Sequence, residues 1–431
     1  MNPFTQADRY SPRADVDGHI QKIITSYIDG IRLQFAVGGQ LTGWQKLVKG
    51  IVAGCTVSVV LFIMVMNLLI NTAQRETRGL KTKSGIYLTS SRGFMDDLTM
   101  STTTHVQVRR MLTALTDVAS WGRMKFKAVK SRALVIKKGQ ATERFKLYVQ
   151  NEEIPSKVKI PIASLGKWFH ASLRDRDNAK KLKQQVEDDL KKIDRCGLHG
   201  KLQAWLYQHA LLSRLLWPLM LYEVASTTAE ALERTTSSHL RKWLRVPPSF
   251  TRIGLSGKTK KLQLSLSSLV EVFKIAKTRL VLILRDSPDE CIRGAGIETA
   301  LAKSGQRQSL LARPRAVGLQ GIGATKTVLW SRSDQKERRA MIQSEVRREE
   351  ESARQARAVE MGAQGTWTTW NTTDRKLTWG EIWKYKPLRF SFLLRSVYDL
   401  LPSAANLFRW ALTTDPKFSL CDKTDTLEHG L

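Results

Sequence analysis

The stretch that decides the fold is SGIYLTSSRGFMDDLTMS, from Ser84 to Ser101. Gly85 and Gly93 interrupt β-prone residues, so the pattern predicts a strand, a turn and a second strand. The tetrapeptide FMDD, Phe94 to Asp97, falls where this hairpin would turn, and the second strand would run from Leu98 to Ser101. We therefore expect an antiparallel hairpin that presents two adjacent carboxylates at its tip.

Asp96 and Asp97 are candidate ligands for a divalent cation. Mg²⁺ takes oxygen ligands and binds through one or two carboxylates plus substrate phosphates. Two-metal phosphoryl transfer needs carboxylates that converge on ions about 3.5–4 Å apart. An isolated Asp-Asp pair is more often a surface turn, so the metal interpretation depends on what surrounds it.

The charge of the chain favours a polyanionic partner. Lys and Arg number 70 against 39 Asp and Glu, which gives a formal net charge of +31. Such an excess is typical of binding to nucleic acid or to an anionic membrane face, although some proteins are basic for neither reason. The length of 431 residues allows roughly two to four domains.

The cysteines predict neither a disulfide framework nor a complete zinc site, because the four of them lie far apart in the sequence. They fit a reducing intracellular compartment, the nucleus or the cytoplasm. Charged residues among the first nineteen positions argue against a secretory signal.

An apolar run from Ile51 to Ile70 is long enough to span a bilayer. Thr56, Ser58 and Asn67 interrupt it, and basic residues flank both ends, so the orientation in a membrane would be undecided. A membrane span and a buried core helix are both open from this segment alone, and the downstream FMDD motif favours the core helix.

Hydrophobic periodicity predicts an α+β region to residue 170 and helices beyond it. We expect residues 1–18 to be irregular, a helix from His19 to near Gly30 and a strand from Arg32 to Val37. A helix should cover His105 to Arg123, and strands should follow at Ala133 to Lys137 and Phe145 to Val149. The predicted inward side of that helix comprises Val108, Met111, Leu112, Leu115 and Trp121.

The second half of the chain is predicted to be mostly helical. Residues 171–250 should form a helical lobe, with Leu182, Val186 and Leu190 on one buried side and a helix that stops at Pro247 and Pro248. Residues 251–365 read as a linker followed by a mixed-charge helix, Asp334 to Met361, most simply a solvated one. Residues 366–431 carry tryptophans that we expect in the core, namely Trp367, Trp370, Trp379, Trp383 and Trp410.

Four motifs within residues 45–169 resemble those of reverse transcriptases, in the family's order and approximate spacing. The segment KGIVAGCTVS, Lys49 to Ser58, is similar to the nucleotide and template loop, and FMDD is similar to the metal-binding turn. Lys130 and Ser131 resemble the motif whose lysine lies near the triphosphate, and LGKWF, Leu165 to Phe169, resembles the primer-grip hairpin. The resemblance implies site residues Lys49, Gly50, Gly54, Ser58, Asp96, Asp97, Lys130, Leu165, Gly166 and Lys167.

The resemblance extends to RNA-directed DNA polymerases of non-LTR retrotransposons. The segment ALERTTSSHLRKWLRVPPSF, Ala231 to Phe250, looks like their thumb helix and its proline stop, and the segments that begin at Arg354 and Leu377 are similar to their later regions. This implies a partial polymerase palm, made of an antiparallel sheet with packed helices, then a helical thumb and a mostly helical C-terminal region. It also implies Mg²⁺ as cofactor, with an RNA template and a DNA primer as partners.

The resemblance also predicts two departures from the family. The family's upstream palm aspartate has no counterpart, because Asp8, Asp15, Asp17 and Asp29 lie in no apolar strand; we expect them on the surface and the chain alone to be inactive. Near the end, Cys421 and His429 match part of a zinc knuckle, but Phe418 occupies the first cysteine position. We therefore expect no zinc, and we expect His105 and His170 to be structural or surface histidines and not catalytic bases.

Two other functions stay open from the sequence. One is a single-pass membrane protein anchored by residues 51–70. The other is a protein with the same fold that binds nucleic acid without turnover.

Overall fold

The structure, a computed structural model, describes residues 17–46, 52, 54–156, 160–257, 262–295, 333–361, 367–370, 373, 375–426 and 429. Backbone contacts divide the chain into two compact units. Unit 1 is Met1–Ile160 with Asp289–Gly296, and unit 2 is Pro161–Pro288 with Ile297–Leu431. The fold is α+β, as predicted, and each strand pair in the described residues is a two-stranded antiparallel sheet.

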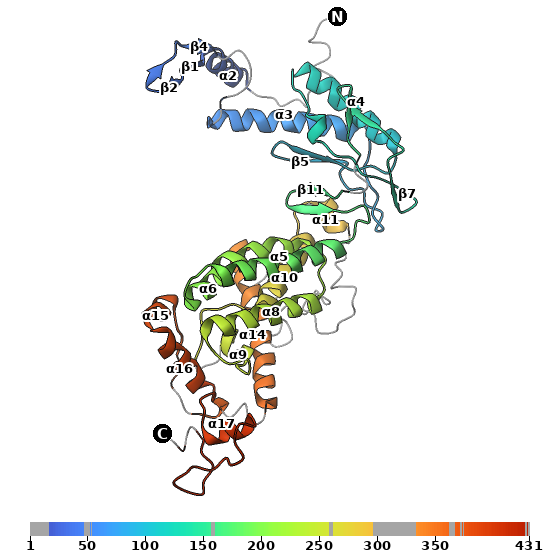
Figure 1. Ribbon diagram of the computed structural model, residues 1–431. Helices are drawn as coiled ribbons and strands as arrows, with labels where there is room; N and C mark the ends of the chain where they lie inside the picture. Colours follow the sequence, from blue (N-terminus) through green and yellow to red (C-terminus); the bar gives the residue numbers. More distant parts are fainter. Residues whose placement is uncertain are drawn as a thin grey trace, which may run out of the picture. The chain divides into compact units, whose positions relative to one another are not determined.

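Unit 1 combines three longer helices with short hairpins (Figure 1). An N-terminal helix is followed by a hairpin that closes at two consecutive glycines, and two longer helices then pack with the FMDD hairpin between them in sequence. The elements are α2 (Gly18–Gly30), β1 (Arg32–Leu33), β2 (Ala36–Val37), β3 (Gln40–Leu41), β4 (Gln45–Lys46), α3 (Thr56–Arg75), β5 (Ser91–Phe94), β6 (Asp97–Met100), α4 (His105–Trp121), η1 (Ala128–Lys130), β7 (Val135–Lys137), β8 (Gln140–Thr142), β9 (Leu147–Val149), β10 (Glu152–Ile154) and α11 (Glu290–Gly294).

The core of unit 1 forms where α4 meets α3 and the β9–β10 hairpin. Met111 and Leu115 of α4 are buried with Leu69 and Ala73 of α3, whereas Leu112 packs on the hairpin side with Leu147. Thr104 begins α4 with a capping box, which satisfies backbone donors of its first turn. The predicted strands at 133–137 and 145–149 are confirmed as β7 and β9.

Unit 2 begins with a hairpin and continues as packed helices (Figure 1). Its elements are β11 (Ile162–Ser164), β12 (Lys167–Phe169), α5 (Arg176–Arg195), α6 (Gly200–Leu206), η2 (Tyr207–Leu211), α7 (Leu212–Leu221), α8 (Ser226–Leu244), α9 (Arg252–Ser256), α10 (Leu269–Arg285), α14 (Gln335–Glu360), α15 (Trp379–Lys384), α16 (Pro387–Val397) and α17 (Ala404–Arg409).

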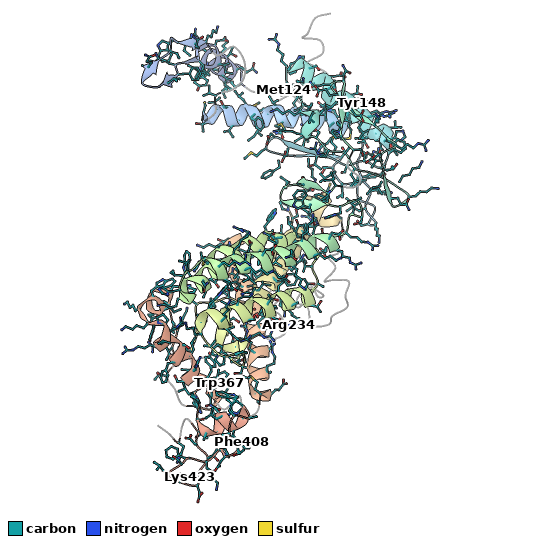
Figure 2. The ribbon with its side chains drawn as sticks, viewed as in Figure 1. Met124, Tyr148, Arg234, Trp367, Phe408 and Lys423 are labelled. Atoms are coloured by element: carbon teal, nitrogen blue, oxygen red, sulfur yellow. The ribbon has the colours of Figure 1, made fainter. Side chains whose placement is uncertain are left out.

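A single large hydrophobic cluster joins most of these helices. The three residues predicted for the buried side of α5 are all in it, and α8 ends at Leu244 before the two prolines, as predicted. Trp367, labelled in Figure 2, is buried and meets Tyr398 edge-on, with ring centroids 4.9 Å apart. Trp383 differs from the expectation, since it is exposed and stacks on Trp379.

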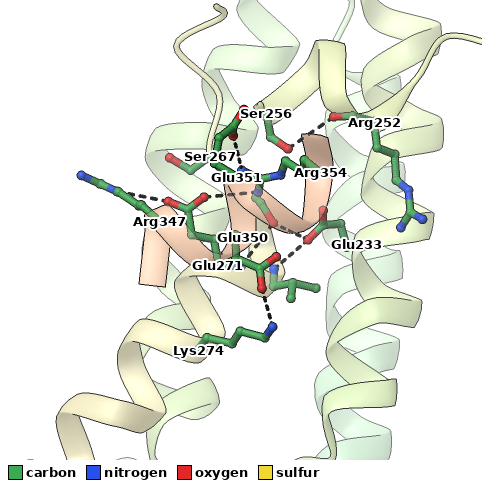
Figure 3. A network of polar contacts seen from close by, with 12 residues as sticks. Glu233, Arg252, Ser256, Ser267, Glu271, Lys274, Arg347, Glu350, Glu351 and Arg354 are labelled. Carbon is green, nitrogen blue, oxygen red and sulfur yellow. Dashed lines mark hydrogen bonds and ion pairs between the residues drawn. The ribbon is translucent and has the colours of Figure 1, made fainter. Parts of the chain in front are cut away.

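Buried ion pairs fix α14 against α10 (Figure 3). The Glu271 carboxylate of α10 accepts hydrogen bonds from Arg347 at 3.1 Å and from Arg354 at 3.2 Å, and the side chains of Glu271 and Arg354 are each only 7% exposed. Lys274 pairs with Glu350 on the same two helices. The mixed-charge helix is therefore not simply solvated, because one side of it supplies partners for buried charges.

Glu233 of α8 fixes the N-terminus of α10, in the same turn as Glu271. Its carboxylate accepts hydrogen bonds from the Ser268 hydroxyl at 2.6 Å and from the backbone N–H of Val270 at 2.7 Å. A carboxylate at a helix N-terminus satisfies free N–H groups and interacts favourably with the helix dipole. Since Glu271 pairs with α14, the position of α10 depends on charges from both neighbouring helices.

Two expectations for unit 1 are wrong in part. Helix α3 begins at Thr56, and its buried residues are Leu69, Thr72 and Ala73. Its first half exposes apolar side chains such as Ile63, because only the second half packs against α4 and β5. Its most apolar window is 22% buried, and the helix is long enough to cross a membrane. Trp121 is 57% exposed, because it does not lie on the buried side of α4 that carries Met111 and Leu115.

Arg354→Ala should lower the free energy of unfolding of unit 2 by about 3 kcal/mol, because it leaves the buried Glu271 carboxylate short of a partner. Arg348→Ala is the matched control on the same helix: Arg348 pairs with Glu345 but is 59% exposed, so about 0.5 kcal/mol or less is expected. Urea unfolding followed by tryptophan fluorescence measures both. Equal losses for the two variants would contradict a buried ion-pair network.

Candidate functional site

Asp96 and Asp97 lie at the tip of the β5–β6 hairpin. Phe94 pairs with Asp97 in the ladder, so Met95 and Asp96 form a two-residue loop. Met95 has a φ of 53°, and a positive φ at the first loop position is typical of a hairpin turn that usually has glycine there. A side chain in this region of φ costs on the order of 1 kcal/mol and persists where the surroundings hold the turn.

Helix α3 holds this hairpin in place. Gln74 Nε2 donates a hydrogen bond to the carbonyl oxygen of Ser91, at 2.8 Å. A Cβ at Gly93 would lie 2.7 Å from Cδ1 of Ile70, so a larger residue there would require the end of the Ile70 side chain to shift. The exposed end of the hairpin then consists of Phe94, Met95 and the two aspartates.

The two carboxylates are free to bind a cation. Both aspartates are exposed, and neither carboxylate makes a hydrogen bond or ion pair with another side chain in the part of the chain that the structure describes. No third His, Cys, Asp or Glu joins them within the described residues. Their oxygen donors fit Mg²⁺, which completes its shell with water and substrate phosphates, but two carboxylates give a weaker site than three.

The predicted nucleotide loop lies only partly within the described residues, and Lys49 and Gly50 fall outside them. Gly54 has a φ of 86°, a conformation that favours glycine, and it leads into the start of α3. Ser58 lies half-buried in the first turn of that helix. The structure thus gives Gly54 a backbone role, whereas the nucleotide contact stays a prediction.

Cys55 of the KGIVAGCTVS segment immediately precedes α3, and its environment was not predicted from the sequence. Its Sγ lies 3.1 Å from the hydroxyl of Tyr27 in α2. The hydrogen bond from Tyr27, aided by the backbone N–H of Ser58, lowers the pKa of the Cys55 thiol to about 7. A thiolate therefore forms near neutral pH beside the predicted nucleotide loop.

Lys130 ends the short η1 helix and is exposed. Ala128, in the same turn, is buried against Leu112 and Leu147, which fixes η1 on the α4 core. Lys130 makes no ion pair with any of the residues that the structure describes. Its ammonium group is thus available to an anion, and its predicted contact with a triphosphate stays a prediction.

The predicted primer-grip motif forms the β11–β12 hairpin in unit 2. Leu165 and Gly166 both have positive φ, 48° and 77°, as a two-residue type I′ turn requires. Gly166 lies against the indole of Trp217, where a Cβ would be 2.7 Å from Nε1. The turn is therefore fixed by α7 as well as by its own backbone.

Lys167 of this hairpin is engaged within unit 2. Its Nζ donates to Oδ2 of Asp175 at 3.0 Å, and it lies 5.9 Å from the ring centroid of Tyr222. Burial acts to raise the pKa of Asp175, but hydrogen bonds from the Glu223 backbone, Asn178 and Lys167 outweigh it and lower that pKa. Lys167 thus anchors the hairpin, and its predicted contact with a primer stays a prediction.

The remaining candidates have structural partners. Asp17 caps α2, the His105 ring stacks on Phe145 with centroids 4.6 Å apart, and His170 Nε2 lies 3.1 Å from Oδ1 of Asn178. Cys421 Sγ lies 3.1 Å from His429 Nε2, so the structure does bring these two together. Among the described residues no third potential ligand joins them, and the expectation that zinc does not bind stays a prediction.

Alkylation of Cys55 by iodoacetamide should increase with pH around a midpoint near 7, because the thiolate is the reactive form. Tyr27→Phe removes the main hydrogen bond to the thiolate, so the midpoint should rise toward that of an ordinary thiol. Peptide mass spectrometry separates Cys55 from Cys196, Cys291 and Cys421. An unchanged midpoint in Tyr27→Phe would contradict the assignment.

No protein-family model matches this sequence, and no curated protein matches it significantly. An assignment of function therefore depends on the FMDD turn, on the residues around it and on the charge of the chain.

Proposed function

We propose that the chain is a fragment of an RNA-directed DNA polymerase of a non-LTR retrotransposon, able to bind nucleic acid and inactive by itself. The observation that carries this proposal is the FMDD turn. Its two free carboxylates lie at the end of a hairpin that packs closely on α3 through Gly93 and through the hydrogen bond from Gln74 to Ser91.

In this proposal Asp96 and Asp97 hold the metal, and their carboxylates orient it toward substrate phosphates. A divalent metal bound there would supply activation of the attacking oxygen and stabilisation of the leaving group. Lys130 would compensate negative charge on the triphosphate, and Ser58 with Gly54 would line the nucleotide loop. The β11–β12 hairpin would position the primer end through its backbone, because Lys167 is already paired with Asp175.

The proposal places the palm in unit 1 and the thumb and C-terminal region in unit 2. Unit 1 has the hairpins and packed helices that a partial palm needs, although its strands form separate pairs. In this proposal an additional strand with a third carboxylate would join the separate hairpins and complete the two-ligand site. The net charge of +31 supports a partner with many phosphates.

A protein that binds nucleic acid without turnover is the second candidate, favoured by the two-carboxylate site. A membrane anchor is the third, favoured by the exposed first half of α3. The second half of that helix is packed on α4 and hydrogen-bonded to β5. The exposed half alone is shorter than the roughly 20 residues that a span needs, which argues against the anchor.

Primer extension on an RNA template with Mg²⁺ tests the polymerase assignment. The chain, a version with an added N-terminal palm and fingers segment, and the Asp96→Ala/Asp97→Ala form of each are compared. Synthesis is expected only from the completed, unmutated form, with a loss of at least about a hundredfold in its Asp variant, because loss of the metal ligands removes several kcal/mol of transition-state stabilisation.

Binding of a short RNA–DNA duplex by the same four proteins provides the control. All should bind, and the Asp variants should bind no more weakly than their parents, since Asp96 and Asp97 act in chemistry and not in holding the duplex. Synthesis that survives in the Asp variant would contradict the metal role. Binding by every form with no synthesis by any would favour the second candidate.

A further inference from the structure

An open cavity of about 630 Å³ lies in unit 2 where α5 begins beside the start of α8. Four of the residues that line it are cationic, and we call them the basic groove: Arg174, Arg176, Lys180 and Lys183. Three of these follow one another along one side of α5 at positions i, i+4 and i+7. They share that side because residues three and four apart are neighbours on a helix.

The carboxylates that line the same cavity do not neutralise the basic groove. Asp175 accepts hydrogen bonds from Lys167, Asn178 and the Glu223 backbone, so its charge is compensated within unit 2. Glu223 interacts favourably with the buried Lys277. Asp175 and Glu223 therefore each interact with a lysine that does not line the cavity.

Three of the groove cations have no acidic partner in the described part of the chain. Arg174, Arg176 and Lys180 make no ion pair with any described residue, whereas Lys183 lies 4.0 Å from Glu187. Uncompensated like charges held side by side repel one another. Such an arrangement is stabilised when an anion enters the groove.

The size of the groove indicates a chain of anions. Arg176 and Lys183 are seven residues apart, which is roughly 10 Å along the helix axis at 1.5 Å per residue. One free phosphate group cannot contact both ends of such a row, whereas successive phosphates of a nucleic-acid strand can. The opening of the groove to solvent also suits a strand that passes along it.

We propose that the basic groove binds the phosphate backbone of a nucleic-acid strand. The inference rests on the proposed function, because it names the residues of unit 2 through which the fragment holds its RNA–DNA partner. Arg176 and Lys180 would each contact a phosphate, and Arg174 would contact the strand from the loop before α5. Contacts of this kind position a strand and carry no base specificity.

The double variant Arg176→Gln/Lys180→Gln tests the groove. Fluorescence anisotropy of a labelled RNA–DNA duplex is measured with the full chain across a salt titration. Two lost phosphate contacts should reduce the steepness of log K against log salt by about 2 and weaken binding about tenfold or more at 0.1 M salt, from counterion release.

Lys191→Gln/Arg195→Gln is the matched control. It removes the same charge from the far end of α5, where Lys191 and Arg195 are exposed and lie outside the groove. It should change the salt slope by much less than the groove variant. The conservative variant Arg176→Lys/Lys180→Arg should keep wild-type binding, which separates lost charge from misfolding.

The outcomes are distinguishable from failure of the proposed function. If the wild-type chain does not bind the duplex, the proposed function fails and the groove fails with it. If the wild-type chain binds, but the groove and control variants lose equal affinity and equal slope, only the groove assignment is overturned. Inorganic phosphate that bound in the groove without competing with the duplex would overturn it as well.

Discussion

The close packing of β5 on α3 is the contact on which the candidate site depends. Gly93 allows the strand to approach Ile70 and Met66, and Gln74 fixes it through the carbonyl of Ser91. The hairpin that follows can then project beyond the helix and carry Asp96 and Asp97 at its tip. A larger residue at position 93 would require the Ile70 side chain to move and would disturb the packing that holds the hairpin on α3.

Charge organises the rest of the chain in two ways. In the interior of unit 2, Glu271 pairs with Arg354, and Glu233 accepts hydrogen bonds from Ser268 and Val270, which together fix α10 between its neighbours. On the surface, cations such as Arg176 and Lys180 have no acidic partners among the described residues. Buried charges need partners because desolvation is costly, whereas exposed cations are free to meet an anionic ligand.

Local signals in the sequence predicted many elements correctly. The helical spacing of apolar residues predicted α4, α5 and α8. The glycine pattern around FMDD predicted the β5–β6 hairpin, and the resemblance of LGKWF predicted the β11–β12 hairpin. Helix α10 was missed although Ser268 and Glu271 have the spacing of a capping box. In the structure the Glu271 carboxylate pairs with Arg347 and Arg354, and Glu233 instead accepts a hydrogen bond from the N-cap Ser268. Local spacing does not reveal this tertiary arrangement.

Other features depend on tertiary contacts that composition does not specify. The apolar run of α3 predicted a helix, but not that its first half would be exposed, because hydrophobicity does not say which neighbour covers it. The low pKa of Cys55 depends on Tyr27, which lies 28 residues earlier in the chain. The basic groove likewise needs the start of α8 beside α5, a proximity that neither segment encodes alone.

The central claim is that the FMDD turn holds a divalent cation, and methyl NMR of the full chain with Mn²⁺ tests it most directly. Mn²⁺ accepts the same carboxylate ligands as Mg²⁺ and broadens signals of nearby nuclei. The Met95 methyl signal is identified by its absence in Met95→Leu. It should broaden first in the wild type and stay sharp in Asp96→Asn/Asp97→Asn. The control variant Asp415→Asn/Asp422→Asn should behave as wild type. A Met95 signal that stayed sharp in the wild type, or broadened equally in the Asp96 and Asp97 variant, would contradict the account.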